Sequence, residues 1–104
     1  MRNGPQGLAF RRLYEDGNAE FYASLSEADY HLCCILAYWI GPNDEDRIEE
    51  WFRESALAGY HPPEERKPDP DGYVQRTIIN AIASRQYFFD PDFNSSLTQI
   101  SILL

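Results

Sequence analysis

The stretch LSEADYHLCCILAYWIG, residues 25–41, has the pattern of a buried amphipathic helix. Ser26 is followed three residues later by Asp29, which is a capping box with Asp in place of the usual Glu. Gly41 and the proline after it end the helix, because glycine turns freely and proline cannot continue a helix. Between these signals, apolar residues recur at helical spacing: Ala28, Leu32, Ile35, Leu36 and Trp39. The pattern predicts a helix with one face in a core.

Two cysteines and a histidine on this helix raise the question of a metal or redox site. His31 and Cys34 are three residues apart, so they share a helix face on which both could bind one metal ion. A structural zinc site usually needs four ligands in Cys or His pairs, and the sequence has no second pair. Cys33 and Cys34 are neighbours that point in different directions, so they cannot staple a small secreted fold. We expect both to be small apolar fillers of the core.

The composition indicates one compact, acidic, cytoplasmic domain. The 104 residues are 43% hydrophobic and 14% aromatic, which is too apolar for a disordered chain. The longest apolar run is far shorter than the ~18 residues that suggest a membrane span, and no charged-then-apolar leader opens the chain. We therefore expect a cytoplasmic protein with no membrane partner. Seventeen acidic residues against nine basic ones give a net charge of −8, which repels phosphate and argues against an autonomous DNA-binding domain.

Three further segments show helical patterns. Asn43 is the predicted cap of a helix that ends at residues 55–59, and its acidic first turn suits the positive end of the helix dipole. Another helix is predicted over residues 73–84, and a short one over residues 8–14. Between the two long helices, the proline-rich segment 59–72 is expected to be irregular. The buried stripes also include aromatic residues that we expect in the core rather than at a ligand: Trp39, Trp51 and Phe52.

These elements predict an all-α fold, a small bundle of three long helices and one to three short ones. We expect a flexible lead over residues 1–7, the bundle over residues 8–84 and a C-terminal extension over residues 85–104. The extension ends in SSLTQISILL, which would be prone to aggregation if it were exposed. It is therefore expected to pack on the bundle or on a partner, which includes a second copy in a homodimer.

The sequence shows no motif for catalysis. It has no nucleophile elbow, no P-loop and no dinucleotide fingerprint, so we expect neither enzymatic activity nor a metal or cofactor. One carboxylate cluster lies at the start of the second long helix, where the helix dipole and solvent account for it without a two-metal cavity. Its members are Asp44, Glu45, Asp46, Glu49 and Glu50.

Basic and aromatic side chains are the remaining candidates for ligand contacts. Arg76 and Thr77 fall in the first turn of the last predicted helix, where free N–H groups and the dipole favour a phosphate. Arg47 and Arg53 are further candidates for phosphate contacts, and Tyr73 is a candidate for stacking on a base. The alternative is that these arginines balance nearby acidic residues.

Three separated segments resemble a known module in the same order. They are FRRLYEDGN…YASLSEADYHLCCILAYWIG, DEDRIEEWFRESAL and GYVQRTIINAI. Together they resemble the helix-bundle domain of primase-polymerases from phages and plasmids. That family follows a Ser-Glu-Ala-Asp helix with a Trp-x-Gly turn and an Arg-Ile…Phe-Arg-x-Ser helix, which match residues 26–29, 39–41 and 47–55 here. The likeness covers about residues 8–84. The prolines and acids of residues 62–71 depart from the pattern, and residues 85–104 have no counterpart.

The resemblance implies a non-catalytic role in primer synthesis. In the family, this bundle follows a primase/polymerase catalytic domain and engages single-stranded DNA template and the initiating nucleotide. ATP or another NTP is thus an implied ligand, and the catalytic domain an implied partner. This chain has no catalytic domain and is either an excised domain or a standalone protein. The contact residues that the resemblance implies are Arg53, Lys67, Tyr73, Arg76 and Thr77.

A standalone protein of this charge suggests a second hypothesis. A small acidic phage or plasmid protein can inhibit a host nucleic-acid-binding defence complex, as anti-CRISPR and anti-restriction proteins do, through protein contacts or DNA mimicry. The acidic residues between positions 44 and 50 would then form the interaction face. A structural dimerisation module, with residues 97–104 as the contact, is a third possibility.

Overall fold

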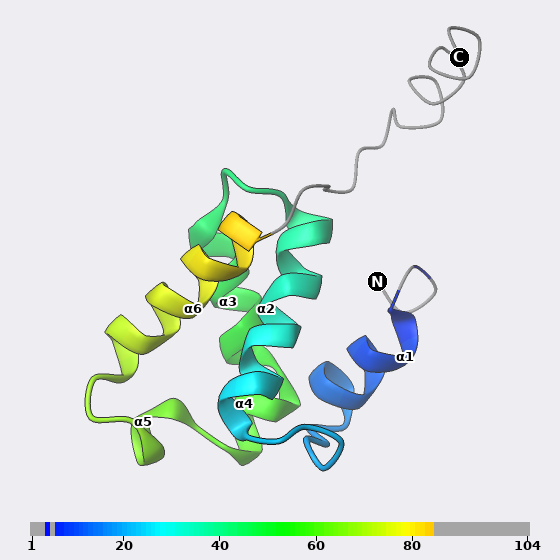
Figure 1. Ribbon diagram of the computed structural model, residues 1–104, viewed down its shortest axis with the longest axis vertical. Helices are drawn as coiled ribbons and strands as arrows, with labels where there is room; N and C mark the ends of the chain where they lie inside the picture. The colour runs from blue at the N-terminus through cyan, green and yellow to red at the C-terminus, as the bar shows by residue number, and fades with distance from the viewer. Residues whose placement is uncertain (1–3, 5, 85–104) are drawn as a thin grey trace, which may run out of the picture.

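The computed structural model describes Gly4 and residues 6–84, and all regular structure within them is helical (Figure 1). Three long helices confirm the predicted all-α bundle: α2 (Leu25–Ile40), α3 (Glu45–Glu54) and α6 (Pro70–Ser84). The shorter elements are α1 (Gly7–Phe10), the π-helical turn η1 (Arg11–Glu15), α4 (Ala56–Tyr60) and α5 (Pro63–Arg66). The predicted C-terminal extension lies outside the described residues, as does most of the predicted lead. No helix in the described part is long and apolar enough to cross a membrane.

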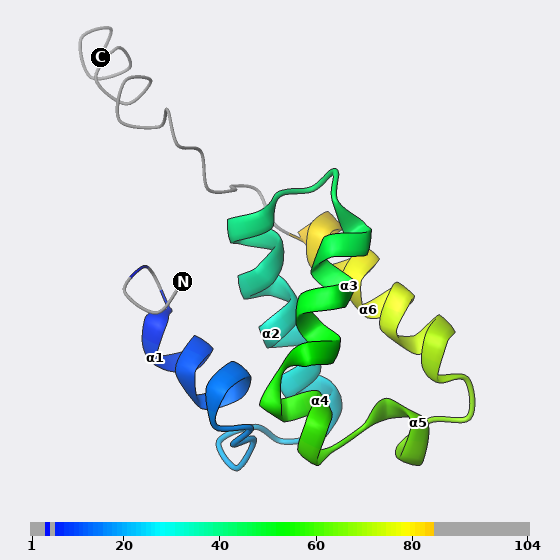
Figure 2. The ribbon, with the colours of Figure 1, turned by 180° about the vertical axis from the view of Figure 1, so that it is seen from behind.

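The helix α2 forms the centre of the bundle. It lies between α1 on one side and α6 on the other, and it also packs on α3 (Figures 1 and 2). The predicted stripe is buried, and the core extends over several elements, with Leu13, Leu32, Ile48, Phe52 and Ile78 among its members. Cys33 and Cys34 are buried within this core, as expected of apolar fillers. Trp39 and Trp51 are only partly buried and pack on its edge, so the prediction that both are core residues is wrong in degree.

The predicted N-caps of two long helices are displaced. The N-cap of α2 is Ser24, whose Oγ accepts a hydrogen bond from the Glu27 N–H at 3.1 Å, and the Glu27 carboxylate accepts one from the Ala23 N–H. The prediction of Ser26 and Asp29 as the capping pair is therefore wrong, because an equivalent pair with the more usual Glu lies two residues earlier. Likewise, Asp44 rather than Asn43 caps α3, accepting from the Arg47 N–H at 3.3 Å.

The predicted second helix is broken in two at Ser55. This residue is buried, its hydroxyl donates to the Phe52 carbonyl at 2.6 Å, and its Oγ accepts from the Ala58 N–H at 3.1 Å. The break turns α4 toward η1, where Gly17 has a φ of +66° and a Cβ would lie 2.9 Å from the Ala56 backbone. Positive φ and close packing both explain the glycine at this turn.

The proline-rich segment contains helix starts, so the prediction that it is wholly irregular is wrong. Pro63 is the first residue of α5 and Pro70 the first of α6, positions where proline loses no helical hydrogen bond. Asp69 accepts from the Gly72 N–H at 3.3 Å, as an N-cap does. As a result, α6 begins three residues before the predicted start at Tyr73.

Candidate nucleic-acid interface

The structure brings together two of the five predicted contact residues. Lys67 follows α5 directly and Tyr73 lies near the start of α6, and the Lys67 Nζ is 4.4 Å from the centre of the Tyr73 ring. The same ammonium donates a hydrogen bond to the Ser26 Oγ at 2.8 Å. A cation over an aromatic face with a hydroxyl acceptor holds the lysine head in one place. Both side chains are partly buried.

A buried carboxylate lies beneath this pair. Asp29 is fully buried on α2, and its Oδ2 accepts from the Tyr73 hydroxyl at 2.6 Å and from the Arg66 Nη2 at 2.5 Å. Its Oδ1 and the Arg66 Nη1 are buried without a hydrogen-bond partner among the described residues. We call these five residues the Asp29 cluster: Ser26, Asp29, Arg66, Lys67 and Tyr73. The cluster joins α2, α5 and α6.

The charges in the Asp29 cluster stabilise each other. Burial and the hydrogen bond to Asp29 raise the pKa of Tyr73, so the phenol remains a neutral donor at physiological pH. Burial alone would lower the pKa of Arg66, but the hydrogen bond and charge of Asp29 outweigh it and raise that pKa. Arg66 and Lys67 supply two cations against a single carboxylate. The cluster is thus locally positive on a strongly acidic chain.

Arg53 forms part of a different network. Its guanidinium reaches three carboxylates, at 2.9 Å from Glu49, 2.7 Å from Glu64 and 2.9 Å from Asp71. The hydrogen bond to Glu49 is the main reason that the pKa of Arg53 is raised. The network links α3 to α5 and α6, as expected for an arginine that balances nearby acids. Because these three carboxylates neutralise the guanidinium charge, Arg53 is a poor phosphate ligand.

Arg76 and Thr77 do not lie at a helix start. Because α6 begins at Pro70, both are beyond the first turn, where the free N–H groups are. Thr77 is buried and its hydroxyl donates to the Tyr73 carbonyl at 2.8 Å. Arg76 is exposed, with its Nη1 3.7 Å from an Asp69 oxygen. The prediction of a phosphate site at the helix start is therefore wrong for this pair, and Arg76 remains only as an exposed cation.

Ser26, Asp29 and Arg66 are the members of the cluster that the sequence did not predict as contact residues. Asp29 lies one helical turn before Leu32 on the inward face of α2, and a carboxylate at a core position requires a cation or donors. This signal was hidden by the capping interpretation of the same residue. His31, the other polar candidate on α2, contacts Tyr22 at 2.5 Å and Gln6 at 2.9 Å through its two ring nitrogens.

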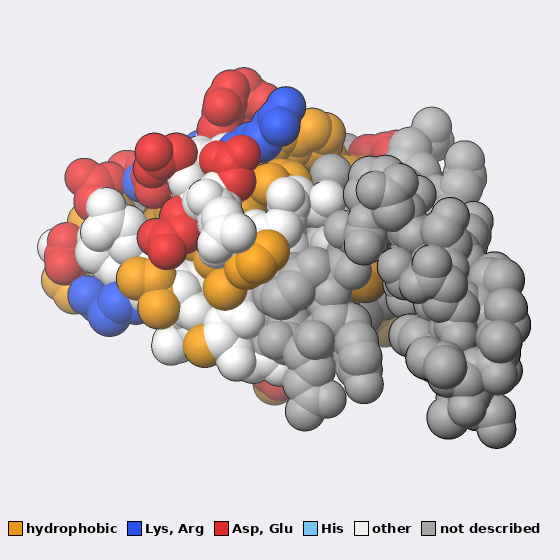
Figure 3. All heavy atoms as spheres, turned by 90° about the horizontal axis from the view of Figure 1, so that it is seen from above, with side chains coloured by type: hydrophobic (Ala, Val, Ile, Leu, Met, Phe, Trp, Pro, Cys, Tyr) orange, Lys and Arg blue, Asp and Glu red, His pale blue; other side chains and the backbone are white. Residues whose placement is uncertain are grey.

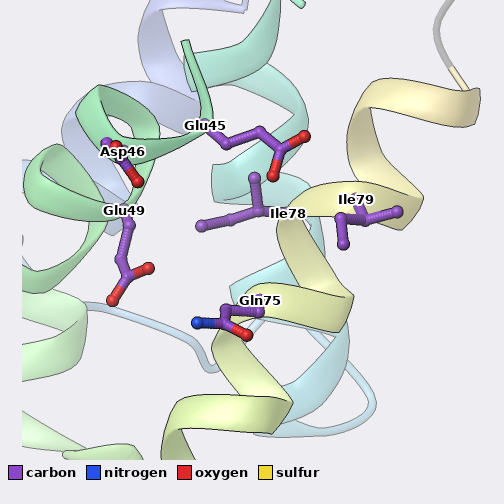
Figure 4. Close-up of a pocket in the computed structure, with 6 residues that line it drawn as sticks. All are labelled: Glu45, Asp46, Glu49, Gln75, Ile78 and Ile79. Carbon is purple, nitrogen blue, oxygen red and sulfur yellow. The ribbon is translucent and has the colours of Figure 1, made fainter. Parts of the chain in front are cut away.

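The carboxylates of the predicted acidic face have different roles in the structure. Asp44 caps α3 and Glu49 is bound to Arg53, whereas the side chains of Glu45, Asp46 and Glu50 are exposed. A pocket of about 90 Å³ lies between α3 and α6 beside this face (Figure 4). Its lining residues are Glu45, Asp46, Glu49, Gln75, Ile78 and Ile79. The carboxylates of this pocket lie on α3, and its isoleucines on α6.

Comparison with known protein families gives a match over most of the described chain. The family model of the NrS-1 polymerase HBD domain matches residues 25–91, which begins at the first residue of α2 and includes every member of the Asp29 cluster. The search of curated proteins and the search of solved structures found no match. The matched range covers more than half of the chain, in the region that holds the three long helices.

Proposed function

The chain belongs to the family of the NrS-1 polymerase HBD domain, a helical accessory domain of mobile-element primase-polymerases, and we propose that it engages single-stranded DNA template and the initiating nucleotide for primer synthesis. Its partner in this role is the catalytic domain of the polymerase. The module itself positions strand and nucleotide and contributes no catalytic group. The resemblance of the sequence to the family supports the role, and the Asp29 cluster supplies residues that suit it.

The observation that carries this proposal is the fixed position of Lys67. It is the single lysine of the chain, and the Tyr73 ring and the Ser26 hydroxyl hold its ammonium beside Arg66. An ammonium is a compact charge that binds phosphate well, and affinity for nucleic acid depends mainly on phosphate contacts. A held cation loses less side-chain entropy on binding than a free one. Among the described residues, Lys67 is thus the cation whose position is best preorganised to bind a phosphate.

The neighbouring residues receive different roles in this proposal. One face of the Tyr73 ring is covered by Lys67 and its hydroxyl is bound to Asp29, so Tyr73 positions the lysine rather than stacking on a base. Arg76 lies three residues further along α6 and is exposed, so it is the second phosphate contact. Arg53 and Thr77 are assigned to the structure of the bundle. ATP presents the same phosphate chemistry and is expected to compete with the strand for Lys67.

A binding titration tests the proposal. A short fluorescent single-stranded oligonucleotide is titrated with the full chain at low salt, with and without ATP. We expect Lys67→Gln to weaken binding and to reduce the magnitude of the slope of log affinity against log salt by about 0.7, the value for one phosphate contact on a single strand. Arg11→Gln is the matched control, because it removes the same charge from an exposed position on η1. If the Lys67→Gln variant and the unmodified chain bind the oligonucleotide with equal affinity, the proposal is wrong.

The single lysine allows a second, independent test. An amine-acetylating reagent modifies Lys67 and the N-terminal amine, and mass spectrometry separates the two products. We expect the oligonucleotide to protect Lys67 from acetylation while the N-terminal amine reacts as before. Protection of neither amine at oligonucleotide concentrations that saturate the anisotropy signal would place the strand elsewhere on the surface.

A further inference from the structure

The pocket between α3 and α6 lies apart from the Asp29 cluster. Ile78 points from α6 toward α3, and the side chain of Glu45 extends toward α6 (Figure 4). Tyr73, by contrast, reaches Asp29 on α2. The pocket and the Asp29 cluster therefore use different sides of α6.

Helix capping explains only part of this pocket. The dipole of α3 favours acidic residues in its first turn, which accounts for the presence of Glu45 and Asp46. It does not account for the apolar floor, where Ile79 is 50% exposed beside these carboxylates. Neither Glu45 nor Asp46 forms an ion pair with a described residue, whereas Glu49 is shared with Arg53. Seen from above, the described part of the molecule exposes hydrophobic side chains among acidic ones (Figure 3).

The size and charge of the pocket define its occupant. Sites for nucleotides and other small molecules usually measure about 300–1,000 Å³. The volume here is about 90 Å³, which suits a single side chain. The acidic rim repels phosphate and attracts a cation, and the isoleucine floor suits an aliphatic chain. Lysine and arginine combine an aliphatic stem with a cationic head.

We propose that the pocket between α3 and α6 is a docking site for a basic segment of a partner protein, one lysine or arginine of which fills it. The stem of that side chain covers Ile78 and Ile79, and its cation contacts Glu45 and Asp46. Contacts with the apolar floor and the acidic rim act together. The site therefore binds a segment that contains both basic and apolar residues more tightly than one that contains basic residues alone.

A peptide titration tests this docking site. The probe is a capped peptide of sequence AKLRLKA, and the control peptide is AQLQLQA. The full chain carries ¹³C-labelled isoleucine methyl groups, which report on Ile78 and Ile79 by NMR. We expect the probe, but not the control, to shift the signals of these two methyls, and we expect added salt to weaken the effect. Shifts confined to other isoleucines would overturn the proposal.

Charge and floor variants sharpen the test. Glu45→Gln with Asp46→Asn is expected to weaken probe binding about tenfold, because two partly screened ion pairs are lost. Glu50→Gln is the matched control, as an exposed acid on α3 outside the pocket lining. Ile79→Ser also weakens binding in our proposal, and its half-exposed position spares the fold. Unchanged affinity in both pocket variants would overturn the docking site.

Nucleic acid serves as the opposing ligand in the same experiment. A single-stranded oligonucleotide that shifts the signals of Ile78 and Ile79 and displaces the probe would overturn a protein-docking role. Because the peptide titration contains no nucleic acid, its result is independent of strand binding at Lys67. Either proposal can therefore fail while the other stands.

Discussion

At the residue scale, Asp29 determines the geometry of the candidate site. A buried carboxylate is costly unless cations and donors surround it, and Arg66 and Tyr73 supply both. These partners come from positions 37 and 44 residues later in the chain. The ring that holds Lys67 is itself held by Asp29, so a core residue fixes a surface cation.

Removing the Asp29 carboxylate should destabilise the protein strongly. Asp29→Ala leaves Arg66 partly buried without its partner, and breaking a buried pair costs roughly 3–5 kcal/mol in the free energy of unfolding. Asp71→Asn is the control, because it breaks an ion pair of an exposed acid and should cost less than about 1 kcal/mol. Urea denaturation followed by circular dichroism measures both. Similar losses in the free energy of unfolding in the two variants would show that the buried Asp29 carboxylate contributes no more to stability than an exposed one.

Because the Tyr73 phenol has a raised pKa, we expect the free energy of unfolding to fall at alkaline pH. Its pKa in the folded protein is raised above the usual value near 10, so folding binds this proton more tightly than the unfolded chain does. The resulting stability is complete below the pKa of the unfolded chain and is lost as pH rises through the higher folded pKa. Urea midpoints between pH 8 and 12 should therefore fall less steeply in Tyr73→Phe. Tyr60→Phe, at an exposed position, is the control and should follow the unmodified chain.

At the element scale, the long helices could be predicted from periodicity, but their exact starts could not. Ser24 with Glu27 and Ser26 with Asp29 fit the same capping pattern two residues apart. The choice between them depends on the tertiary pairing of Asp29 with Arg66, and a local pattern contains no information on that contact. Similarly, the prolines indicated a break in the chain, but a proline can also begin a helix once an N-cap precedes it.

Alanine substitutions at the two candidate caps distinguish them. Ser24→Ala removes the acceptor for the Glu27 N–H and should lower the free energy of unfolding by about 1 kcal/mol. Ser26→Ala leaves the cap intact and removes the acceptor for Lys67, so we expect a smaller loss of stability but weaker oligonucleotide binding. Thermal unfolding and the anisotropy titration measure the two effects. A greater loss of stability in Ser26→Ala would restore the cap predicted from the sequence.

At the scale of the whole molecule, the fold class and the family could be predicted from the sequence, whereas the arrangement of the site could not. Lys67 and Tyr73 were both predicted contacts, but only the packing of α5 against α6 places them together. Arg53 was predicted beside them and instead joins three carboxylates. Side chains from distant segments compete for the same charges, and that competition is resolved only by the folded chain.

The distribution of charge over the molecule predicts weak, salt-sensitive strand binding. A body with a net charge of −8 repels phosphate at long range, whereas Lys67 and Arg76 attract it at short range. Two phosphate contacts on a single strand give a slope of log affinity against log salt of about −1.4. Anisotropy titrations from 20 to about 200 mM salt measure this slope. A slope near −4 would require several more cations than these two and would indicate that the strand binds another surface. Attachment to a catalytic domain would compensate for the weak affinity, because it raises the effective concentration of the strand at the module to about the millimolar range.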